Sequence, residues 1–502
     1  MSSSASTRRS LETRRGTYVD SVTLMQVSKR VGALPGVRAA LVAMATDLNL
    51  DLAVQMGFEP PAGVSPNEML VALEADGDDA LEDAQAEVDR ALAEAASPAP
   101  STFGAAPPPA TVAAAARGLD PDTTVALVST PGQYAFADAL DAVDAGLLTM
   151  VFSDNVPVQQ EVALKERAAA RGVLVMGPDC GTAVVGGVGL GFANVVRPGP
   201  VGIVAASGTG AQHLLALLDG ADVGVSHCLG VGGRDLSDAV GGRSTLQALD
   251  LLDADPGTEL IVVVSKPPAD AVAERVRAHA ASLATPVVFG LLGPGRPDLT
   301  ETAKAVVETA GRAWTAPEHW PGSVASVRGD GVLRGLFSGG TLCDEAMIIA
   351  AETLGPIASN IPLDPADALG PDLESRGHTM IDFGDDDLTR GRPHPMIDGS
   401  LRVERMLAET ADPGCGVLLL DVVLGLGADP DPAATLVEPV RAATAAGLPV
   451  VVAVVGTRDD PQDLTATCAA LNTAGAHVHL SNAGATRAAL DLIAGTHPGA
   501  TA

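Results

Sequence analysis

Two glycine-rich turns in this chain carry hydroxyl and backbone donors where an anion could bind. The turn at 207–210 follows the apolar run 201–206, and the turn at 338–341 follows the apolar run 333–337. Each turn opens a helical pattern, so its N–H groups and the partial positive charge of a helix N-terminus would converge on a phosphate. For either turn alone, a tight turn that needs glycine for packing is the alternative. The residues of the two turns are Ser207, Gly208, Thr209 and Gly210, and Ser338, Gly339, Gly340 and Thr341.

Few cations are available to neutralise such an anion. The chain has only four lysines, and Lys266 stands at the carboxyl end of an apolar run, where parallel sheets bind ligands. A solvated surface position is the alternative for this lysine. Arg234, in the segment GVGGRD (230–235), could clamp a phosphate or a carboxylate. That segment lacks the spacing of a dinucleotide-binding fingerprint, and neither turn above continues into a Walker signature.

The segment 382–398 (DFGDDDLTRGRPHPMID) concentrates the polar groups that could transfer a proton. His394 could act as a general acid or base there. The aspartates could instead bind a divalent cation such as Mg²⁺, or the segment could be a solvated loop. Cys180 has no basic neighbour in sequence, which favours an inert thiol.

These candidates follow short apolar runs that predict parallel strands. Near-continuous apolar strands separated by helical patterns are typical of sheets covered on both faces, so the sequence predicts an α/β fold. Ligands of such sheets bind beyond the carboxyl ends of the strands. The predicted strands span residues 124–128, 148–152, 173–176, 201–205, 260–264, 286–291, 333–337, 417–422, 450–455 and 477–480.

The beginning of the chain predicts a separate small domain. Residues 14–95 alternate helical and strand patterns and form a small α/β domain, and residues 1–13 are predicted to be an unstructured tail. The Pro/Ala/Ser-rich segment 96–110 is predicted to be a linker.

The composition excludes several classes of protein. The formal net charge of -31 argues against nucleic acids and anionic membranes as partners. An aromatic content of 2% argues against a base-stacking platform. The five cysteines form no CxxC pair, and no apolar run reaches the length of a membrane span, so we expect a cytoplasmic protein without structural disulfides or zinc.

Seven phrases together resemble the FdrA family of the succinyl-CoA synthetase superfamily. The resemblance covers residues from about 120 to 495, and the N-terminal block fits the same family. Several phrases are long and rare, which makes the match specific. The phrases are VFSDNVP (151–157), MGPDCGT (176–182), ASGTG (206–210), GVGGRDLS (230–237), VSKPPADA (264–271), GRPHPMID (391–398) and LLLDVVLGLGADP (418–430).

The resemblance implies a fold and an order of domains. A CoA-binding Rossmann-like domain at 111–197 would precede two flavodoxin-like synthetase domains, of the α-type at 198–315 and of the β-type at 325–502. In the synthetases, helices of the two flavodoxin-like domains point their N-termini at a phosphate carried on a histidine. Carried over, these helices begin at the two turns described above. The turns of the CoA or substrate crevice would contain Pro131, Gly132, Gln133, Ser153, Asp154, Asn155, Gly177, Pro178 and Asp179.

The sequence also departs from the synthetases. It has no stretch long enough for an ATP-grasp domain. The segment 289–296 (FGLLGPGR) has no histidine where a synthetase carries its phosphohistidine loop, and Lys266 lies where a GEIGG turn would supply an acidic partner. These departures predict that free phosphate or a phosphoryl ester occupies the site.

Three functions follow from the resemblance. The first is the subunit of an oxamate carbamoyltransferase in allantoin and purine-nitrogen breakdown, with Lys266, Arg234 and His394 as catalytic residues and with partner subunits from neighbouring genes. The second is an acyl-CoA synthetase that uses CoA and a separate ATP-grasp subunit. The third is a metabolite-binding scaffold without turnover. The sequence demands no cofactor; the resemblance allows CoA, and assembly with copies of the chain itself is also compatible with it.

Overall fold

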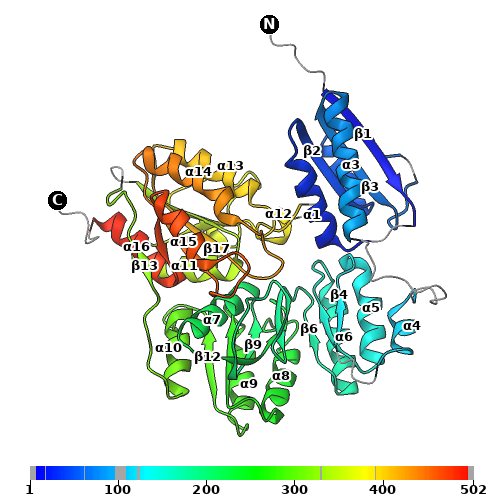
Figure 1. The fold of residues 1–502 in the computed structure, drawn as a ribbon. Coiled ribbons are helices and arrows are strands. Elements are labelled where there is room, and N and C mark those ends of the chain that lie inside the picture. Colours follow the sequence, from blue (N-terminus) through cyan, green and yellow to red (C-terminus); the bar gives the residue numbers. More distant parts are fainter. Residues whose placement is uncertain are drawn as a thin grey trace. The chain divides into compact units, whose positions relative to one another are not determined.

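The computed structural model describes residues 7–16, 19–61, 63–95, 109–120, 125–327, 331–389 and 392–495. They form two compact units (Figure 1). The first contains the described residues up to Ala115, with 129–131, 386–389 and 392–393, and the second contains the described residues of 116–128, 132–385 and 394–495. Within these ranges, no helix is both long and apolar enough to cross a membrane.

The first unit is built around an antiparallel sheet of three strands in the order β1-β3-β2. The middle strand is buried because helices α1 and α3 pack on one face of the sheet and α2 packs on the other. Helix α4 (Val112–Ala116) follows the predicted linker at 96–110, of which only 109–110 lie within the described residues. The elements of the sheet domain are β1 (Thr7–Arg14), α1 (Ser21–Gly32), β2 (Val37–Met44), α2 (Asp47–Gln55), β3 (Met69–Asp76) and α3 (Asp78–Ala95).

The structure corrects the prediction of an unstructured tail at 1–13. Residues Thr7–Arg14 form β1, which pairs with β3 along its whole length, while residues 1–6 lie outside the described range. The charged side chains of β1 line an edge strand, where Arg8 pairs with Asp78 and Arg9 with Glu74. Charges are common on edge strands because they hinder pairing with another chain.

The second unit begins with a short parallel sheet in the order β4-β5-β6. The hairpin of β7 (Thr182–Val185) and β8 (Val188–Gly191) does not join this sheet, because β7 pairs antiparallel with β10 of the next one. This corrects the boundary predicted between 197 and 198, since residues 182–191 extend the following sheet. The elements of the first sheet and its helices are β4 (Val125–Val128), α5 (Gly132–Asp144), β5 (Leu148–Val151), α6 (Val158–Arg171) and β6 (Val175–Met176).

A six-stranded sheet follows, in the order β12-β11-β9-β10-β7-β8. Its parallel strands have the chain order 2-1-3-4 (β10, β9, β11, β12), which is the flavodoxin-like arrangement. The elements are β9 (Pro198–Ala206), α7 (Gly208–Gly220), β10 (Val225–Gly230), α8 (Arg243–Ala254), β11 (Leu260–Ser265), α9 (Asp270–Ala280), β12 (Val287–Leu291) and α10 (Leu299–Thr309).

A seven-stranded sheet completes the second unit, in the order β13-β19-β18-β17-β14-β16-β15. Strands β16, β14, β17, β18 and β19 again have the flavodoxin-like order 2-1-3-4-5. Because β13 (His319–Trp320) pairs with β19, this domain begins before the predicted residue 325. The other elements are β14 (Val332–Phe337), α11 (Gly340–Leu354), β15 (Ala358–Ser359), the 3-10 helix at Pro365–Asp367, β16 (Thr379–Asp382), α12 (Asp386–Thr389, in the first unit), α13 (Ser400–Ala411), β17 (Cys415–Val423), α14 (Pro432–Ala445), β18 (Val450–Val455), α15 (Leu464–Thr473), β19 (His477–His479) and α16 (Asn482–Ala494).

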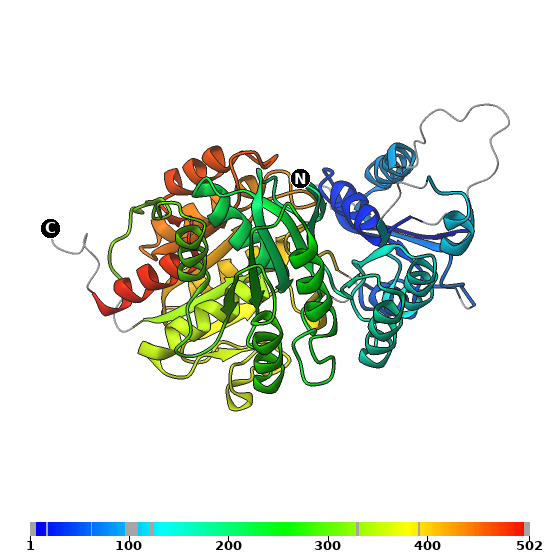
Figure 2. The ribbon, with the colours of Figure 1, turned by 90° about the horizontal axis from the view of Figure 1, so that it is seen from below.

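The two flavodoxin-like domains lie side by side (Figures 1 and 2). Helix α7 packs against α11, and α10 packs against α16, so each domain contributes two helices to the layer between the sheets. This explains why α7 and α11 are buried nearly all round rather than along one stripe. The α/β fold predicted from the sequence, with two flavodoxin-like domains, is confirmed.

Candidate functional site

The two glycine-rich turns lie against each other in the second unit. Ser207 is the N-cap of α7: its Oγ accepts a hydrogen bond from the N–H of Gly210 at 2.9 Å. The same Oγ lies 2.7 Å from Oγ1 of Thr341, in the first turn of α11. A Cβ on Gly339 would stand 2.8 Å from Oγ1 of Thr209, so this approach requires glycine. The N-termini of α7 and α11 therefore meet at the carboxyl ends of β9 and β14.

Solvent reaches this meeting point. Gly208 is exposed, and Thr209 and Gly340 are half-buried. The first N–H groups of an α-helix have no carbonyl partner within the helix, and both helix dipoles place partial positive charge here. The arrangement can therefore hold an anion.

A buried carboxylate occupies part of the second turn. Oδ1 of Asp421, in β17, accepts hydrogen bonds from the N–H and the hydroxyl of Ser338 at 2.7 and 2.8 Å, and Oδ2 accepts from the N–H of Gly339 at 2.8 Å. Nη1 of Arg402 donates to Asp421 Oδ1 at 2.6 Å. Ser338 and Gly339 thus bind an internal anion, and Thr341 is buried against Ser207, which leaves the half-buried Gly340 for a ligand. Sequence reasoning missed Asp421 and Arg402; the available signal was a lone aspartate inside the apolar strand.

Lys266 reaches the meeting point from the turn after β11. Its Nζ lies 3.0 Å from the point where a Cβ on Gly340 would stand, and Oδ2 of Asp382 lies 2.7 Å from that point. Burial lowers the pKa of Lys266, but the carboxylates of Asp344 and Asp382 outweigh this effect and raise it. Lys266 is therefore a cation at neutral pH.

Two carboxyl groups beside Lys266 titrate near neutrality. Burial raises the pKa of Asp382 to about 7 and that of Asp344 to about 6, against the opposing effect of Lys266. Oδ1 of Asp382 accepts the N–H of Gly384 at 2.9 Å, and its backbone is held by the Asn360 amide. A general acid or base works best with a pKa near the working pH, so Asp382 fits that role within the segment 382–398.

His394 fits the predicted proton-transfer role less well. Its Nδ1 accepts the N–H of Met396 at 3.2 Å, and Nε2 lies 2.7 Å from the Cβ position of Gly384, next to Asp382. Burial, together with the charge of Arg402, lowers the pKa of His394 to about 4. The imidazole is therefore neutral at physiological pH and a weak base.

Arg234 has a buried partner on α6. Its Nη2 lies 3.0 Å from Oε2 of the fully buried Glu161 and donates to the carbonyl oxygen of Val156 at 2.8 Å. Both contacts use the same nitrogen, and the side chain is 40% exposed, so a role of Arg234 as a phosphate ligand stays a prediction.

The predicted crevice turns of the second unit pack together. A Cβ on Gly132 would overlap the backbone of Asp154 and Asn155, and the N–H of Asp179 donates to the carbonyl of Ser153 at 2.9 Å. Asn155 and Asp179 have φ of 54° and 56°, a strained conformation that is enriched at functional sites. The remaining crevice residues are Gln133 (exposed), Gly177 and Pro178 (buried), and Pro131, which belongs to the first unit.

Cys180 directly follows this crevice. It is buried, and burial raises its pKa to about 12. The thiol is therefore unreactive, as the sequence predicted.

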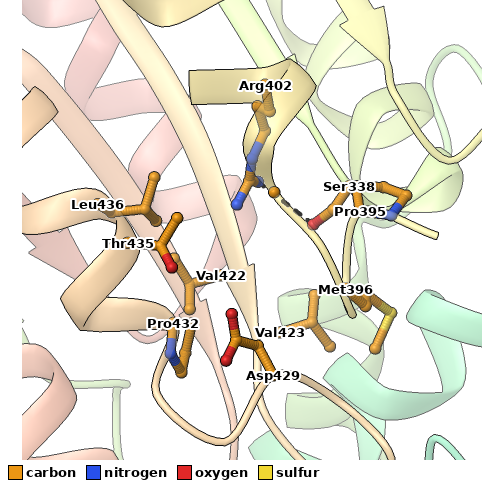
Figure 3. Close-up of a pocket in the computed structure, with 11 residues that line it drawn as sticks. Ser338, Pro395, Met396, Arg402, Val422, Val423, Asp429, Pro432, Thr435 and Leu436 are labelled. Carbon is orange, nitrogen blue, oxygen red and sulfur yellow. Dashed lines mark hydrogen bonds between the residues drawn. The ribbon is translucent and has the colours of Figure 1, made fainter. Parts of the chain in front are cut away.

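A pocket opens beside the second turn (Figure 3). Ser338, Met396, Thr435 and the side chains of Arg402 and Asp429 line it, and the last two enter it from opposite ends. Nε of Arg402 is buried and has no hydrogen-bond partner among the described residues. The guanidinium of Arg402 in the pocket wall therefore makes fewer hydrogen bonds than its donors allow.

Family models match two parts of the chain. The model described as CoA-ligase covers residues 336–492, the domain of the seven-stranded sheet. The model described as AllF, heavy metal-associated domain, covers residues 7–107. The chain therefore contains a CoA-ligase-like domain and an N-terminal domain of a different family.

The chain belongs to the same family as YahF, an uncharacterized protein of Escherichia coli (strain K12), to which it is 38% identical over 86% of each chain. It is 28% identical to the succinate–CoA ligase [ADP-forming] subunit alpha of Methanothermobacter thermautotrophicus over 35% of this chain and 59% of that subunit. A solved structure, the dinucleotide-forming acetyl-coenzyme A synthetase 1 of Ca. Korarchaeum cryptofilum in complex with phosphate and ADP, is 18% identical, with a TM-score of 0.29 over 80% of this chain and 88% of that one.

The residues of the N-terminal domain do not fit the heavy metal that its family description implies. Heavy metals favour thiolate and imidazole ligands. Residues 7–107 contain neither cysteine nor histidine, and no group of three metal-ligating side chains is found among the described residues. No metal chemistry is assigned to this domain.

Proposed function

We propose that this chain binds inorganic phosphate, or the phosphoryl group of an acyl phosphate, where α7 and α11 meet, and acts as an acyl-transfer subunit of CoA-ligase type. The observation that carries the proposal is the contact between the hydroxyls of Ser207 and Thr341, which joins two helix N-termini beside the ammonium of Lys266. Two helix N-termini and one cation at a solvent-accessible point together favour an anionic ligand.

The fixed donors would act on charge that develops during transfer. When the thiol of CoA attacks the acyl carbon of an acyl phosphate, the thiol loses its proton to solvent and negative charge grows on the acyl oxygen. The bond from the acyl carbon to the phosphate oxygen then breaks, and the charge passes to the phosphate that leaves. The N–H groups of Gly208 and Gly340 and the Lys266 ammonium need no rearrangement to stabilise that charge. Removing one such preorganised donor from an enzyme typically slows the reaction by about 10²- to 10³-fold.

The finer activity that the relatives favour is acyl-CoA formation with a partner chain that supplies the nucleotide site. The CoA-ligase model and the likeness to a ligase subunit alpha support this activity. CoA would supply the thiol that accepts the acyl group. The N-terminus of α5 at Gly132 and the turns at Ser153–Asn155 and Gly177–Asp179 would hold its phosphates through backbone donors. The five free, buried cysteines support a cytoplasmic location.

One observation favours carbamoyl transfer as a second candidate. The segment 289–296 has no histidine, and Lys266 lies beside the point where α7 and α11 meet. A site with a lysine and without a histidine suits free phosphate better than a phosphohistidine. In that reaction a phosphate oxygen bonds to the carbamoyl carbon of oxalurate and the C–N bond breaks. Carbamoyl phosphate forms, and oxamate leaves after its nitrogen takes up a proton.

The test is co-expression of the full chain with the products of neighbouring genes, followed by two assays on the purified complex. Acyl-CoA formation from ATP, CoA and a panel of small carboxylic acids is measured beside phosphate-dependent formation of carbamoyl phosphate from oxalurate. We expect acyl-CoA formation, and a loss of at least about 100-fold in Lys266→Ala. Lys304→Ala, which alters an exposed lysine of α10, is the matched control and should remain fully active.

Each outcome decides between the candidates. Carbamoyl phosphate without thioester would replace the ligase by the carbamoyltransferase. Equal activity of Lys266→Ala and Lys304→Ala would refute the phosphate site. Inactivity of a stable complex in both assays would favour a scaffold that binds a metabolite without turnover.

A further inference from the structure

The proposed phosphate site contains a conflict of charge. Lys266 contributes one positive charge, while Asp382 and Asp344 contribute two carboxyl groups beside the same helix N-terminus. With both carboxyl groups ionised, the three side chains carry a net negative charge that would repel a phosphate. Neutralising one of the carboxyl groups removes the conflict.

We propose that Asp382 takes up a proton from solvent when an anion binds, and that its neutral carboxyl group then donates a hydrogen bond to an oxygen of the anion. The inference rests on the proposed phosphate site and adds a binding residue to it. No bond other than those to the proton is made or broken.

The geometry selects Asp382 over its neighbours. Its Oδ1 is fixed by the N–H of Gly384, while Oδ2 lies 2.7 Å from the Cβ position of Gly340, in the first turn of α11. The side chain is 4% exposed, so an ionised form next to a second anion would be poorly solvated. The carboxyl group already titrates near pH 7 before any ligand arrives, so the binding of an anion needs to shift it only slightly.

Other groups around Asp382 cannot take the proton as readily. Lys266 already carries its proton, and His394 has a pKa of about 4. Asp344 titrates lower, at about 6, and burial raises the pKa of the Cys343 thiol well above its usual range, so that it stays neutral. The charged or titratable groups that face Asp382 are Lys266, Cys343, Asp344, Asp385 and His394.

The experiment is isothermal titration calorimetry of the full chain with sulfate, beside inorganic phosphate. Sulfate is the decisive probe because it stays a dianion from pH 6 to 9, whereas phosphate itself titrates in this range. Titrations at pH 7.5 in two buffers of different ionisation enthalpy give the number of protons taken up. We expect between about 0.5 and 0.8 proton per sulfate at pH 7.5, and an affinity that falls by up to about tenfold per pH unit above pH 7.5.

Two isosteric variants assign the proton. Asp382→Asn should bind sulfate without proton uptake and with an affinity that no longer depends on pH from 7 to 8.5. Asp344→Asn removes a neighbouring charge of the same kind and should retain the uptake. Circular dichroism verifies that each variant is folded. The titrations of the wild-type chain measure proton uptake even if a variant fails to fold.

The outcomes separate this inference from the proposed function. Sulfate binding without proton uptake, or uptake that survives in Asp382→Asn, overturns the role of Asp382 and leaves the anion site intact. Uptake that disappears in Asp344→Asn instead transfers the role to Asp344 and equally refutes the assignment. Absence of both sulfate and phosphate binding from pH 6 to 9 overturns the anion site itself.

Discussion

The buried Lys165 offers the sharpest test of how the second unit is held together. It is 2% exposed, and its ammonium donates to Oε1 of Glu161 at 2.8 Å, to Oδ1 of Asp235 at 2.8 Å and to the carbonyl of Val231 at 2.9 Å. These bonds connect α6 to the loop after β10. Lys165→Met keeps the apolar stem and removes the charge, which leaves two fully buried carboxyl groups without their shared cation.

The magnitude follows from that loss. Breaking a buried ion pair by removing one partner typically costs about 3–5 kcal/mol, because the remaining charge is uncompensated. Asp235 retains hydrogen bonds from Ser244 and Thr245, so the lower half of this range is expected. At about 2 °C per kcal/mol for a large domain, the melting temperature should fall by roughly 6–8 °C.

The assay is thermal unfolding followed by circular dichroism, with Lys304→Met as the matched control. Lys304 is exposed and lies 3.9 Å from Glu308, a surface pair worth at most about 1 kcal/mol. A second measurement adds Asp235→Asn to Lys165→Met, and the combined loss should be at least about 1 kcal/mol smaller than the sum of the single losses. The reasoning is refuted if Lys165→Met melts within 2 °C of Lys304→Met, or if the two losses add.

Three further predictions concern Glu345, Arg234 and the cysteines. Burial raises the pKa of Glu345 to about 7, above its unfolded value near 4.3, so the folded chain binds more protons and its stability should rise as pH falls from 8 to 5. Glu345→Gln should flatten that part of the melting profile, and an unchanged slope would contradict the assignment. Arg234→Ala should leave the sulfate affinity within about twofold in calorimetry. It should lower the free energy of unfolding by about 1–3 kcal/mol in urea, because Glu161 loses a partner. A large loss of sulfate affinity would show that Arg234 belongs to the anion site. All five cysteines are buried, so a thiol reagent monitored by absorbance should label none in the native chain and five in urea, and rapid native labelling would disprove this.

The residues near the two turns show what could be predicted from the sequence. Apolar runs followed by glycine, serine and threonine located the carboxyl ends of β9 and β14, because parallel strands place their ligand-binding turns there. Lys266 was identified by the same argument. The contact between Ser207 and Thr341 also agrees with two consecutive flavodoxin-like domains whose helices face each other.

The roles of other residues could not be predicted from the sequence, because they depend on contacts between distant segments of the chain. In the sequence, Asp421 is a lone aspartate within an apolar strand, and nothing there indicates its role. The structure shows that it accepts three hydrogen bonds from Ser338 and Gly339. Arg234 and His394 have the right chemistry for a site, but only the structure shows that Arg234 pairs with a buried glutamate of α6 and that burial lowers the pKa of His394. Strand β1 was missed because its charged residues lack an apolar period, and its partner β3 lies about 60 residues further along the chain.

The sequence by itself determined the fold class, the parallel strands and the positions of the turns, because these depend on local periodicity and on the backbone freedom of glycine. Only the tertiary structure decided which charged side chains remain available to a ligand. Lys266 and Asp382 lie over 100 residues apart in sequence and both approach Gly340, whereas Lys165 is enclosed by the buried carboxyl groups of Glu161 and Asp235. The pKa of a carboxyl group depends on burial and on nearby charges, and both are fixed only when distant segments pack together.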